Sequence, residues 1–290
     1  MRGSVVVSCY SRPEAFEKLV ASIYANYGVN ELKKIFLVQD SREDLNAIIE
    51  TYQDKETLII NAPAFADSPL ANINFNRFHS QVIAFDILRS DWSLIIEEDV
   101  ELNTNVIFFV QEIMKSFMSD KYFRGINLGS YELEGDLGDY SIVNQGIHGQ
   151  ASAIPRRTWS EIKKKVSHAN LYKDAYDWIV EPIFRNGFVV VPNRSLFLDH
   201  GWVFPTHAPS DSSAPHYLKL ESSYRQSNSR LMKSKISQKQ ITHTWFGTQT
   251  YRDSPFFLLL IRVKNLWIYS QIRKSLHRVY TSKIRVWHSR

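Results

Sequence analysis

The chain has 290 residues, 44% of them hydrophobic, which is enough to build one large core or two smaller ones. Thirty-five Lys and Arg against 30 Asp and Glu give a formal net charge of +5, a mild excess that is compatible with binding phosphate groups or an anionic membrane surface. Cys9 is the single cysteine, so an intrachain disulfide and a cysteine-based zinc site are both excluded. The apolar run near the N-terminus is too short for a signal peptide or a membrane span, and we therefore expect a cytoplasmic protein.

Short apolar runs alternate with amphipathic helical patterns through most of the chain. The runs typical of strands are Val5–Val7, Ile35–Val38, Leu58–Ile60, Leu94–Ile96, Gly125–Gly129, Phe188–Val191 and Leu196–Gly201. The patterns typical of helices cover residues 16–23, 45–49, 77–88, 106–117 and 155–166, and Pro63–Asn76 is expected to be a loop. This alternation predicts an α/β fold with a mostly parallel central sheet flanked by helices, and with ligands bound beyond the carboxyl ends of the strands.

Several familiar signatures are absent from the sequence. No Gly-rich P-loop or dinucleotide fingerprint follows the first strand, where Gly3 stands alone, which disfavours a kinase or an NAD-dependent enzyme. No Gly-x-Ser-x-Gly elbow is present, and Ser8 or Ser11 would lack a His and an Asp in the right order, so acyl transfer is disfavoured.

The most informative stretch is Trp92–Glu101, WSLIIEEDVE, in which an apolar strand ends abruptly at Glu97, Glu98 and Asp99. Three adjacent carboxylates repel one another unless a cation neutralises them, which favours a hard divalent ion such as Mg²⁺ or Mn²⁺. The alternative is a charged strand end that turns into solvent.

In a parallel sheet, Arg12 and Asp40 follow the first two strands and would share one edge with the acidic cluster. The segments VVVSCYSRP, FLVQDS and IIEEDVELN, in this order, resemble motifs of the GT-A glycosyltransferases, in particular the N-acetylglucosaminyltransferase I family and its bacterial relatives. The resemblance extends over roughly Ser4–Gly201. It implies that Arg12 and Asp40 hold the uridine nucleotide, and that His79, or alternatively Asn76, contributes from the helix before the acidic strand.

The same resemblance implies roles within and beyond the acidic cluster. Glu97 would contact the donor sugar, Glu98 the ribose and Asp99 the metal. Glu98 replaces an Asp of the family, and its longer side chain would either reach the ribose differently or join the metal shell. The Gly-x-Gly segment of the family resembles Gln145–Gln150, which would contact donor or acceptor. His200 follows the last expected strand, and it either completes the metal shell, binds a phosphate, or is a structural histidine satisfied by local hydrogen bonds.

Sugar transfer also needs a base that takes the proton of the acceptor hydroxyl. The catalytic aspartate of the family lies in an aromatic-Asp-x-Trp segment, which Tyr176–Trp178 resembles without the intervening residue. Asp177 is therefore the first candidate and Asp174, one helical turn earlier, the second. The alternative interpretation of Asp177 is a surface acid paired with Arg185 or Lys173.

The carboxyl-terminal residues 251–290 differ in composition from the rest. Their only acid is Asp253, and an apolar stripe that includes Leu266 and Trp267 runs between basic positions. We expect residues 1–250 to form the glycosyltransferase domain and residues 251–290 to form a basic amphipathic helix on an anionic membrane surface. The alternatives are a helix packed on the domain or a dimer contact, and no nucleic acid is expected as a partner.

The resemblance implies a metal-dependent, inverting glycosyltransferase, and the basic segment 251–290 predicts that it is peripheral at the inner face of a membrane. Its donor is a UDP-sugar, with N-acetylglucosamine as the best choice of sugar, its cofactor is Mn²⁺ or Mg²⁺, and its acceptor is a glycan or glycolipid. The alternatives are a sugar-nucleotide nucleotidyltransferase, whose usual Gly-rich basic loop the sequence lacks, and a non-catalytic membrane-associated adaptor.

Overall fold

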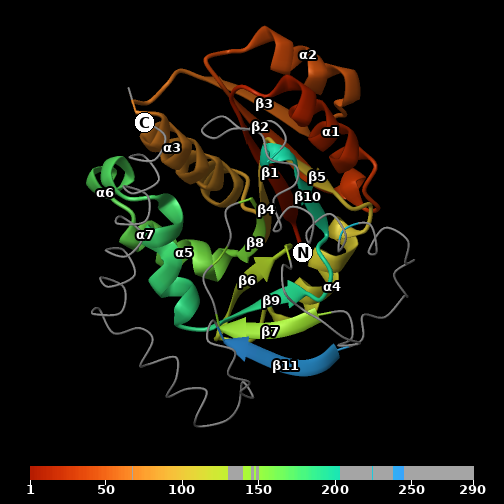
Figure 1. Cartoon of the computed structure of the whole chain (residues 1–290), viewed down its shortest axis with the longest axis vertical. Coiled ribbons are helices and arrows are strands. Elements are labelled where there is room, and N and C mark those ends of the chain that lie inside the picture. The colour runs from red at the N-terminus through yellow and green to blue at the C-terminus, as the bar shows by residue number, and fades with distance from the viewer. Residues whose placement is uncertain are drawn as a thin grey trace, which may run out of the picture.

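The computed structural model describes residues 1–66, 68–129, 140–144, 147, 150–202, 224 and 238–244. Within these residues a nine-stranded sheet lies at the centre, and helices cover both of its faces (Figure 1). The expected α/β fold with a large central sheet flanked by helices is therefore confirmed. The expected Gly-x-Gly segment, apart from residues 147 and 150, lies outside the described residues, and so does the basic segment 251–290.

The central sheet changes direction partway across. Its strands are β1 (Gly3–Cys9), β2 (Lys33–Gln39), β3 (Thr57–Ala62), β4 (Trp92–Glu97), β6 (Phe123–Asn127), β7 (Tyr140–Asn144), β8 (Ala151–Pro155), β9 (Phe188–Pro192) and β11 (Gln238–Thr244), in the order β11-β7-β9-β6-β8-β4-β1-β2-β3. Strands β4, β1, β2 and β3 are parallel, whereas β8 runs antiparallel to both β4 and β6. Two short strands, β5 (Val100–Leu102) and β10 (Phe197–Asp199), form a separate antiparallel pair.

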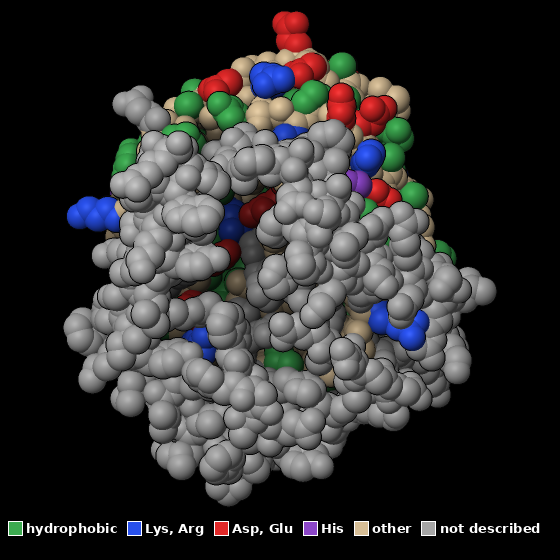
Figure 2. All heavy atoms as spheres, in the orientation of Figure 1, with side chains coloured by type: hydrophobic (Ala, Val, Ile, Leu, Met, Phe, Trp, Pro, Cys, Tyr) green, Lys and Arg blue, Asp and Glu red, His purple; other side chains and the backbone are tan. Residues whose placement is uncertain are grey.

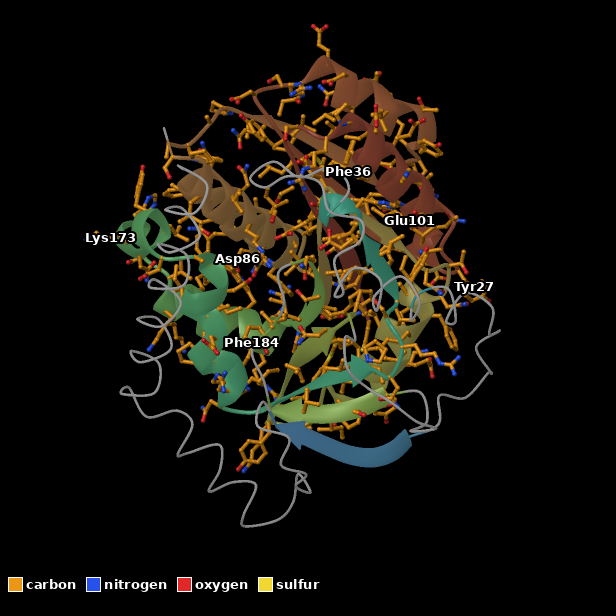
Figure 3. All side chains as sticks on the ribbon, in the orientation of Figure 1. Tyr27, Phe36, Asp86, Glu101, Lys173 and Phe184 are labelled. Atoms are coloured by element: carbon orange, nitrogen blue, oxygen red, sulfur yellow. The ribbon has the colours of Figure 1, made fainter. Side chains whose placement is uncertain are left out.

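Helices form a layer on each face of the sheet. One layer contains α1 (Pro13–Tyr24), α2 (Glu43–Tyr52) and α4 (Val106–Phe117), and the other contains α3 (Pro69–Val82), α5 (Arg156–Lys165), α6 (His168–Lys173) and α7 (Tyr176–Arg185). Successive side chains of a strand point to opposite faces, so Val5 and Val7 of β1 pack in the first core and Val6 in the second. Phe36 of β2 and Phe184 of α7, labelled in Figure 3, likewise belong to different cores. Strands buried on both faces explain the unbroken apolar runs in the sequence.

Helix α3 begins at Pro69, inside the segment that is expected to be a loop. Ser68 caps it by accepting a hydrogen bond from the backbone N–H of Ala71 at 3.5 Å, and Pro69 occupies the first turn. Asparagine has a low helix propensity, which is why the Asn-rich sequence of this segment favours a loop. Tertiary contacts override that preference, because the helix buries a series of polar side chains: Asn72, Asn74, Asn76, Arg77, Ser80 and Gln81. A π-helical segment, η2 (Ile83–Ile87), continues the helix.

Two short 3₁₀ segments, η1 (Val29–Glu31) and η3 (His200–Trp202), connect other elements. None of the described helices is both long enough and apolar enough to cross a membrane. The expected domain boundary at residue 250 and the expected membrane-binding segment after it fall outside the described residues, and both stay predictions.

Candidate functional site

A pocket of about 390 Å³ lies at the carboxyl ends of β1, β2 and β4, and we call it the strand-end pocket. Its wall consists of residues 8–12, residues 39–40, Ala64, residues 95–99 and one side of α3. Acidic and basic side chains are both visible in a recess near the middle of the face in Figure 2. Because the carboxyl ends of parallel strands meet at one edge of a sheet, the fold brings Arg12, Asp40 and the acidic cluster together in this wall.

Glu98 forms hydrogen bonds with the loop that follows β1 and holds it in place. Its carboxylate accepts hydrogen bonds from the backbone N–H groups of Tyr10 and Ser11, the latter at 3.0 Å, and from the Ser11 hydroxyl at 3.5 Å. Hydrogen bonds to an ionised acceptor are roughly twice as strong as those between neutral groups. Glu98 therefore holds the loop that carries Arg12, and the ribose contact implied by the resemblance would have to be made alongside these bonds.

Asp99 and Asp199 place two buried carboxylates close together beside the pocket. Nη1 of Arg12 forms an ion pair with Oδ2 of Asp99, while Oδ1 of Asp99 is buried without a hydrogen-bond partner among the described residues. Gly201 separates the two acids, since a Cβ atom at this position would lie 2.5 Å from Asp99 Oδ2 and 2.9 Å from Asp199 Oδ1. A larger residue at position 201 would therefore displace one of the carboxylates.

These oxygen atoms suit a hard divalent cation. Mg²⁺ is commonly held by one or two carboxylates together with water and substrate phosphates, and Mn²⁺ accepts the same oxygen ligands. The unpartnered Oδ1 of Asp99 and the neighbouring carboxylate of Asp199 are ligands of this kind. Within the described part of the chain, no group of three or more His, Cys, Asp or Glu side chains is arranged to hold a metal ion.

His200 lies next to these acids, but its ring has another partner. Nε2 of His200 is 2.8 Å from Oε2 of Glu101 on β5, and its backbone N–H donates to the carbonyl of Asp99 at 2.7 Å. The hydroxyl of Tyr224 donates to the other oxygen of Glu101 at 3.2 Å. The hydrogen bond from His200 holds the pKa of Glu101, labelled in Figure 3, below its usual value. These contacts favour a structural role for His200 over a place in the metal shell.

Burial changes the proton affinity of two acids at this edge of the sheet. It raises the pKa of Asp199, and the hydrogen bond from the Gly201 backbone N–H offsets part of that effect. Although 39% of its side chain is exposed, desolvation by the surrounding protein raises the pKa of Glu97, where the charge of Arg77 opposes the shift and the charge of Asp177 adds to it. Perturbed carboxyl groups cluster at functional sites, which supports this edge as the candidate site.

Arg77 of α3 joins Asp177 to Glu97. Its Nη1 atom is 3.1 Å from Oδ1 of Asp177 and 3.8 Å from Oε1 of Glu97, and its side chain is 9% exposed. Asp177 lies in the first turn of α7, where the helix dipole favours a negative charge. The alternative pairing with Arg185 is not formed, because Arg185 binds Glu181 at 2.7 Å. Asp177 thus stands beside the pocket, held by a residue of its wall.

Two other candidates lie away from the pocket wall. Asp174 is the C-cap residue of α6, and its backbone carbonyl accepts a hydrogen bond from Asn74 at 2.9 Å. His79 stacks on the ring of Phe65, with 4.7 Å between the ring centroids. Neither Asp174 nor His79 is part of the wall, whereas Asn76, the alternative to His79, is.

Asp40 stands in a bent stretch of backbone at the end of β2. Asp40 and Ser41 both have positive φ, 57° and 50°, a conformation that residues with side chains seldom adopt. The Asp40 carboxylate accepts hydrogen bonds from the backbone N–H of Ala64 at 2.8 Å and from Nε2 of Gln39 at 3.3 Å. Asn76 in turn donates to Gln39 at 2.8 Å. Asp40 is therefore held from two directions in the pocket wall.

Sequence reasoning missed Arg77 and Asp199. The signal for Arg77 was the run NINFNR, since several amides and a guanidinium within one helix indicate that the helix buries polar contacts. The signal for Asp199 was an acid directly after a short apolar run. Asp199 follows the apolar residues 196–198 in the same way that Glu97 follows the apolar residues of β4.

The comparisons with known proteins give a distant structural likeness. No protein-family model matches this chain, and no curated protein matches its sequence. The fragment 1-349 of S. aureus TarS aligns with 81% of this chain and 76% of its own length at 12% identity, with a TM-score of 0.49. The same fragment solved with UDP aligns with 68% of this chain at 10% identity and a TM-score of 0.47, and solved with UDP-GlcNAc with 68% at 11% and 0.43. The chain spans 60% and 58% of the length of these last two structures.

Proposed function

We propose that this chain is a metal-dependent, inverting glycosyltransferase of the GT-A type that takes a UDP-sugar as donor and a glycan or glycolipid as acceptor. The observation that carries the proposal is the strand-end pocket, whose wall holds Arg12, Asp40, Glu97 and Asp99 and beside which Asp177 is fixed. A pocket with a few convergent polar groups among apolar ones is typical of a small-molecule site. N-acetylglucosamine is the donor sugar that the sequence resemblance favours.

On the donor side, each of the wall residues binds a different part of the UDP-sugar. Asp40 accepts hydrogen bonds from the uridine part, and the guanidinium of Arg12 pairs with phosphate oxygens, for which its planar fork is well suited. Glu97, whose side chain is 39% exposed, accepts hydrogen bonds from sugar hydroxyls. Asp99 and Asp199 would hold Mn²⁺ or Mg²⁺, which supplies charge stabilisation to the leaving diphosphate when bound.

On the acceptor side, Asp177 is the general base. Its side chain is 36% exposed, so an acceptor hydroxyl can reach it. Asp177 takes the proton of that hydroxyl while the oxygen forms a bond to the anomeric carbon and the bond from this carbon to the diphosphate breaks. A single displacement of this kind inverts the anomeric configuration.

Binding and turnover of the full-length protein test the proposal. We expect UDP to bind in a calorimeter in the presence of Mn²⁺, and one member of a panel of nucleotide sugars to release UDP in the presence of acceptor glycans. Asp99→Ala is expected to abolish the Mn²⁺-dependent part of UDP binding without unfolding the protein. Pyrophosphate release from UTP and a sugar 1-phosphate would contradict the proposal in favour of a nucleotidyltransferase, and absence of any nucleotide binding would contradict it in favour of an adaptor.

A further inference from the structure

Three buried polar side chains on one side of α3 contact the start of α7. Asn74 accepts a hydrogen bond from the backbone N–H of Tyr176 at 3.0 Å, and Gln81 accepts one from the Tyr176 hydroxyl at 3.2 Å. Between them, Arg77 lies over the Tyr176 ring at 5.4 Å and pairs with Asp177 at 3.1 Å. Residues three and seven positions apart share one side of a helix, so this stripe fixes both the backbone and the side chains at the start of α7.

The same helix also forms one side of the strand-end pocket. Asn72, Ile73 and Asn76 line the pocket from α3, and so does Arg77. Arg77 therefore belongs to both sets of contacts, with one guanidinium nitrogen between Glu97 in the pocket wall and the carboxylate of α7. It is a physical link between the place where the donor binds and the place where the base stands.

We propose that Arg77 is a positioning residue, which sets the location of the Asp177 carboxylate relative to the bound donor. The inference rests on the proposed function. A guanidinium is planar, and this one is buried and stacked on an aromatic ring, so its direction is fixed in a way that a flexible ammonium group would not reproduce. Placement matters because a misplacement of about 1 Å in a reacting geometry reduces the rate by about 10²-fold.

The experiment is a double-mutant cycle on the full-length protein. Arg77→Gln, Arg77→Lys, Asp177→Asn and the corresponding double variants are compared by kcat and by the UDP dissociation constant. We expect Arg77→Gln to lower kcat by about 10²-fold and Arg77→Lys by at least about tenfold, with UDP affinity within about threefold of wild type. In the Asp177→Asn background, we expect either substitution of Arg77 to lower kcat by less than about a further twofold, because no base remains to be positioned.

Arg185→Gln is the matched control. It removes another buried guanidinium from an ion pair, with Glu181 of the same helix, and Arg185 is not part of the pocket wall. We expect this variant to lower Tm while kcat stays within about twofold of wild type, since a lost ion pair alone affects stability rather than the chemical step. If Arg77 had only a structural role, Arg77→Gln would likewise lower Tm and leave kcat within about twofold of wild type.

Three results would overturn the proposal. One is an additive loss of kcat in the Asp177→Asn background, another is a loss of UDP affinity as large as the loss of kcat/KM, and the third is full activity of Arg77→Lys and Arg77→Gln. If the thermal melt shows that Arg77→Gln does not fold, the proposal is tested by the kcat values of Arg77→Lys, Asp177→Asn and their double variant alone. Absence of turnover in the wild-type chain contradicts the proposed function, whereas wild-type turnover with an additive cycle contradicts only the role of Arg77.

Discussion

Asp177 is the side chain on which the proposed chemistry depends, and asparagine has its shape without its ability to take up a proton. We expect Asp177→Asn to leave UDP affinity unchanged and to lower kcat by roughly 10²–10⁴-fold, the range attributed to general-base catalysis. Titration with UDP and a turnover assay measure both quantities. Asp174→Asn is expected to keep the wild-type rate, because Asp174 caps α6 outside the pocket wall. The reverse pattern would move the base to Asp174.

Burial raises the pKa of the Asp199 carboxyl group, and we therefore expect its ionised form to lower the stability of the protein at neutral pH. When the folded-state pKa lies above that of the unfolded chain, the folded state binds the proton more tightly, and stability falls as the pH rises from the lower value to the higher one. Asp199→Asn removes the buried charge and leaves an oxygen to accept the N–H of Gly201. In a buffer with a chelator, we expect this variant to have a higher Tm than wild type at pH 7.

The difference in Tm is expected to shrink as the pH falls through the raised folded-state pKa and below about 4, the ordinary pKa of an aspartate, because the wild-type carboxyl group is protonated in both states only below the lower value. Thermal melts of both proteins between these pH values provide the measurement. A Tm of Asp199→Asn below that of wild type at pH 7 would show that neighbouring groups stabilise the ionised carboxylate more than burial destabilises it, which contradicts the prediction.

The loop between β1 and α1 depends on one carboxylate from another element. Glu98 accepts hydrogen bonds from two backbone N–H groups of this loop, so Glu98→Gln removes the charge that strengthens these bonds and replaces one of its two acceptor oxygens by an NH₂ donor. A hydrogen bond to a charged group contributes about 1.5–3 kcal/mol, and we expect UDP affinity to fall by at least about tenfold as Arg12 loses its fixed position. Glu14→Gln, an exposed change at the start of α1, is the control and is expected to bind UDP normally.

The elements of this fold were predictable where a single physical rule decides them. Strands β1, β2 and β4 are buried on both faces, so each appears in the sequence as an apolar run that ends in polar residues. The start of α3 was not predictable in this way, because its asparagines are stabilised by contacts with segments distant in sequence, such as the bond from Asn74 to the carbonyl of Leu171. For the same reason, the partner of Arg77 could not be identified before the fold placed α7 against α3.

At the scale of the whole molecule, we predict from the sequence that the basic segment 251–290 directs the protein to a membrane surface. If it forms the expected interfacial helix, the full-length protein is expected to sediment with anionic liposomes and much less with neutral ones, because each Lys or Arg near the surface contributes about 1 kcal/mol of attraction. Salt is expected to release part of the bound protein, while insertion of the apolar stripe retains the rest. A version that ends at Ser254 is expected to stay in solution and still bind UDP. Unfolding of that version, together with indifference of the intact protein to liposomes, would show that the segment packs on the domain.

Among the described residues, the wall of the strand-end pocket comes from the first 99 positions, whereas Asp177, the proposed base, lies on α7, after the sheet has changed direction. Under the proposed function, the described donor-binding wall and the base therefore belong to separate stretches of the chain. Under this proposal, substitutions after β8 can change which acceptor hydroxyl reaches Asp177 and leave the residues that contact the donor unchanged. Arg77 connects the two stretches, because it lies in the wall of the strand-end pocket, next to Glu97, and also forms an ion pair with Asp177. If the proposed roles hold, residues around the acceptor can change while the donor contacts stay constant, as long as Arg77 and its partners are kept.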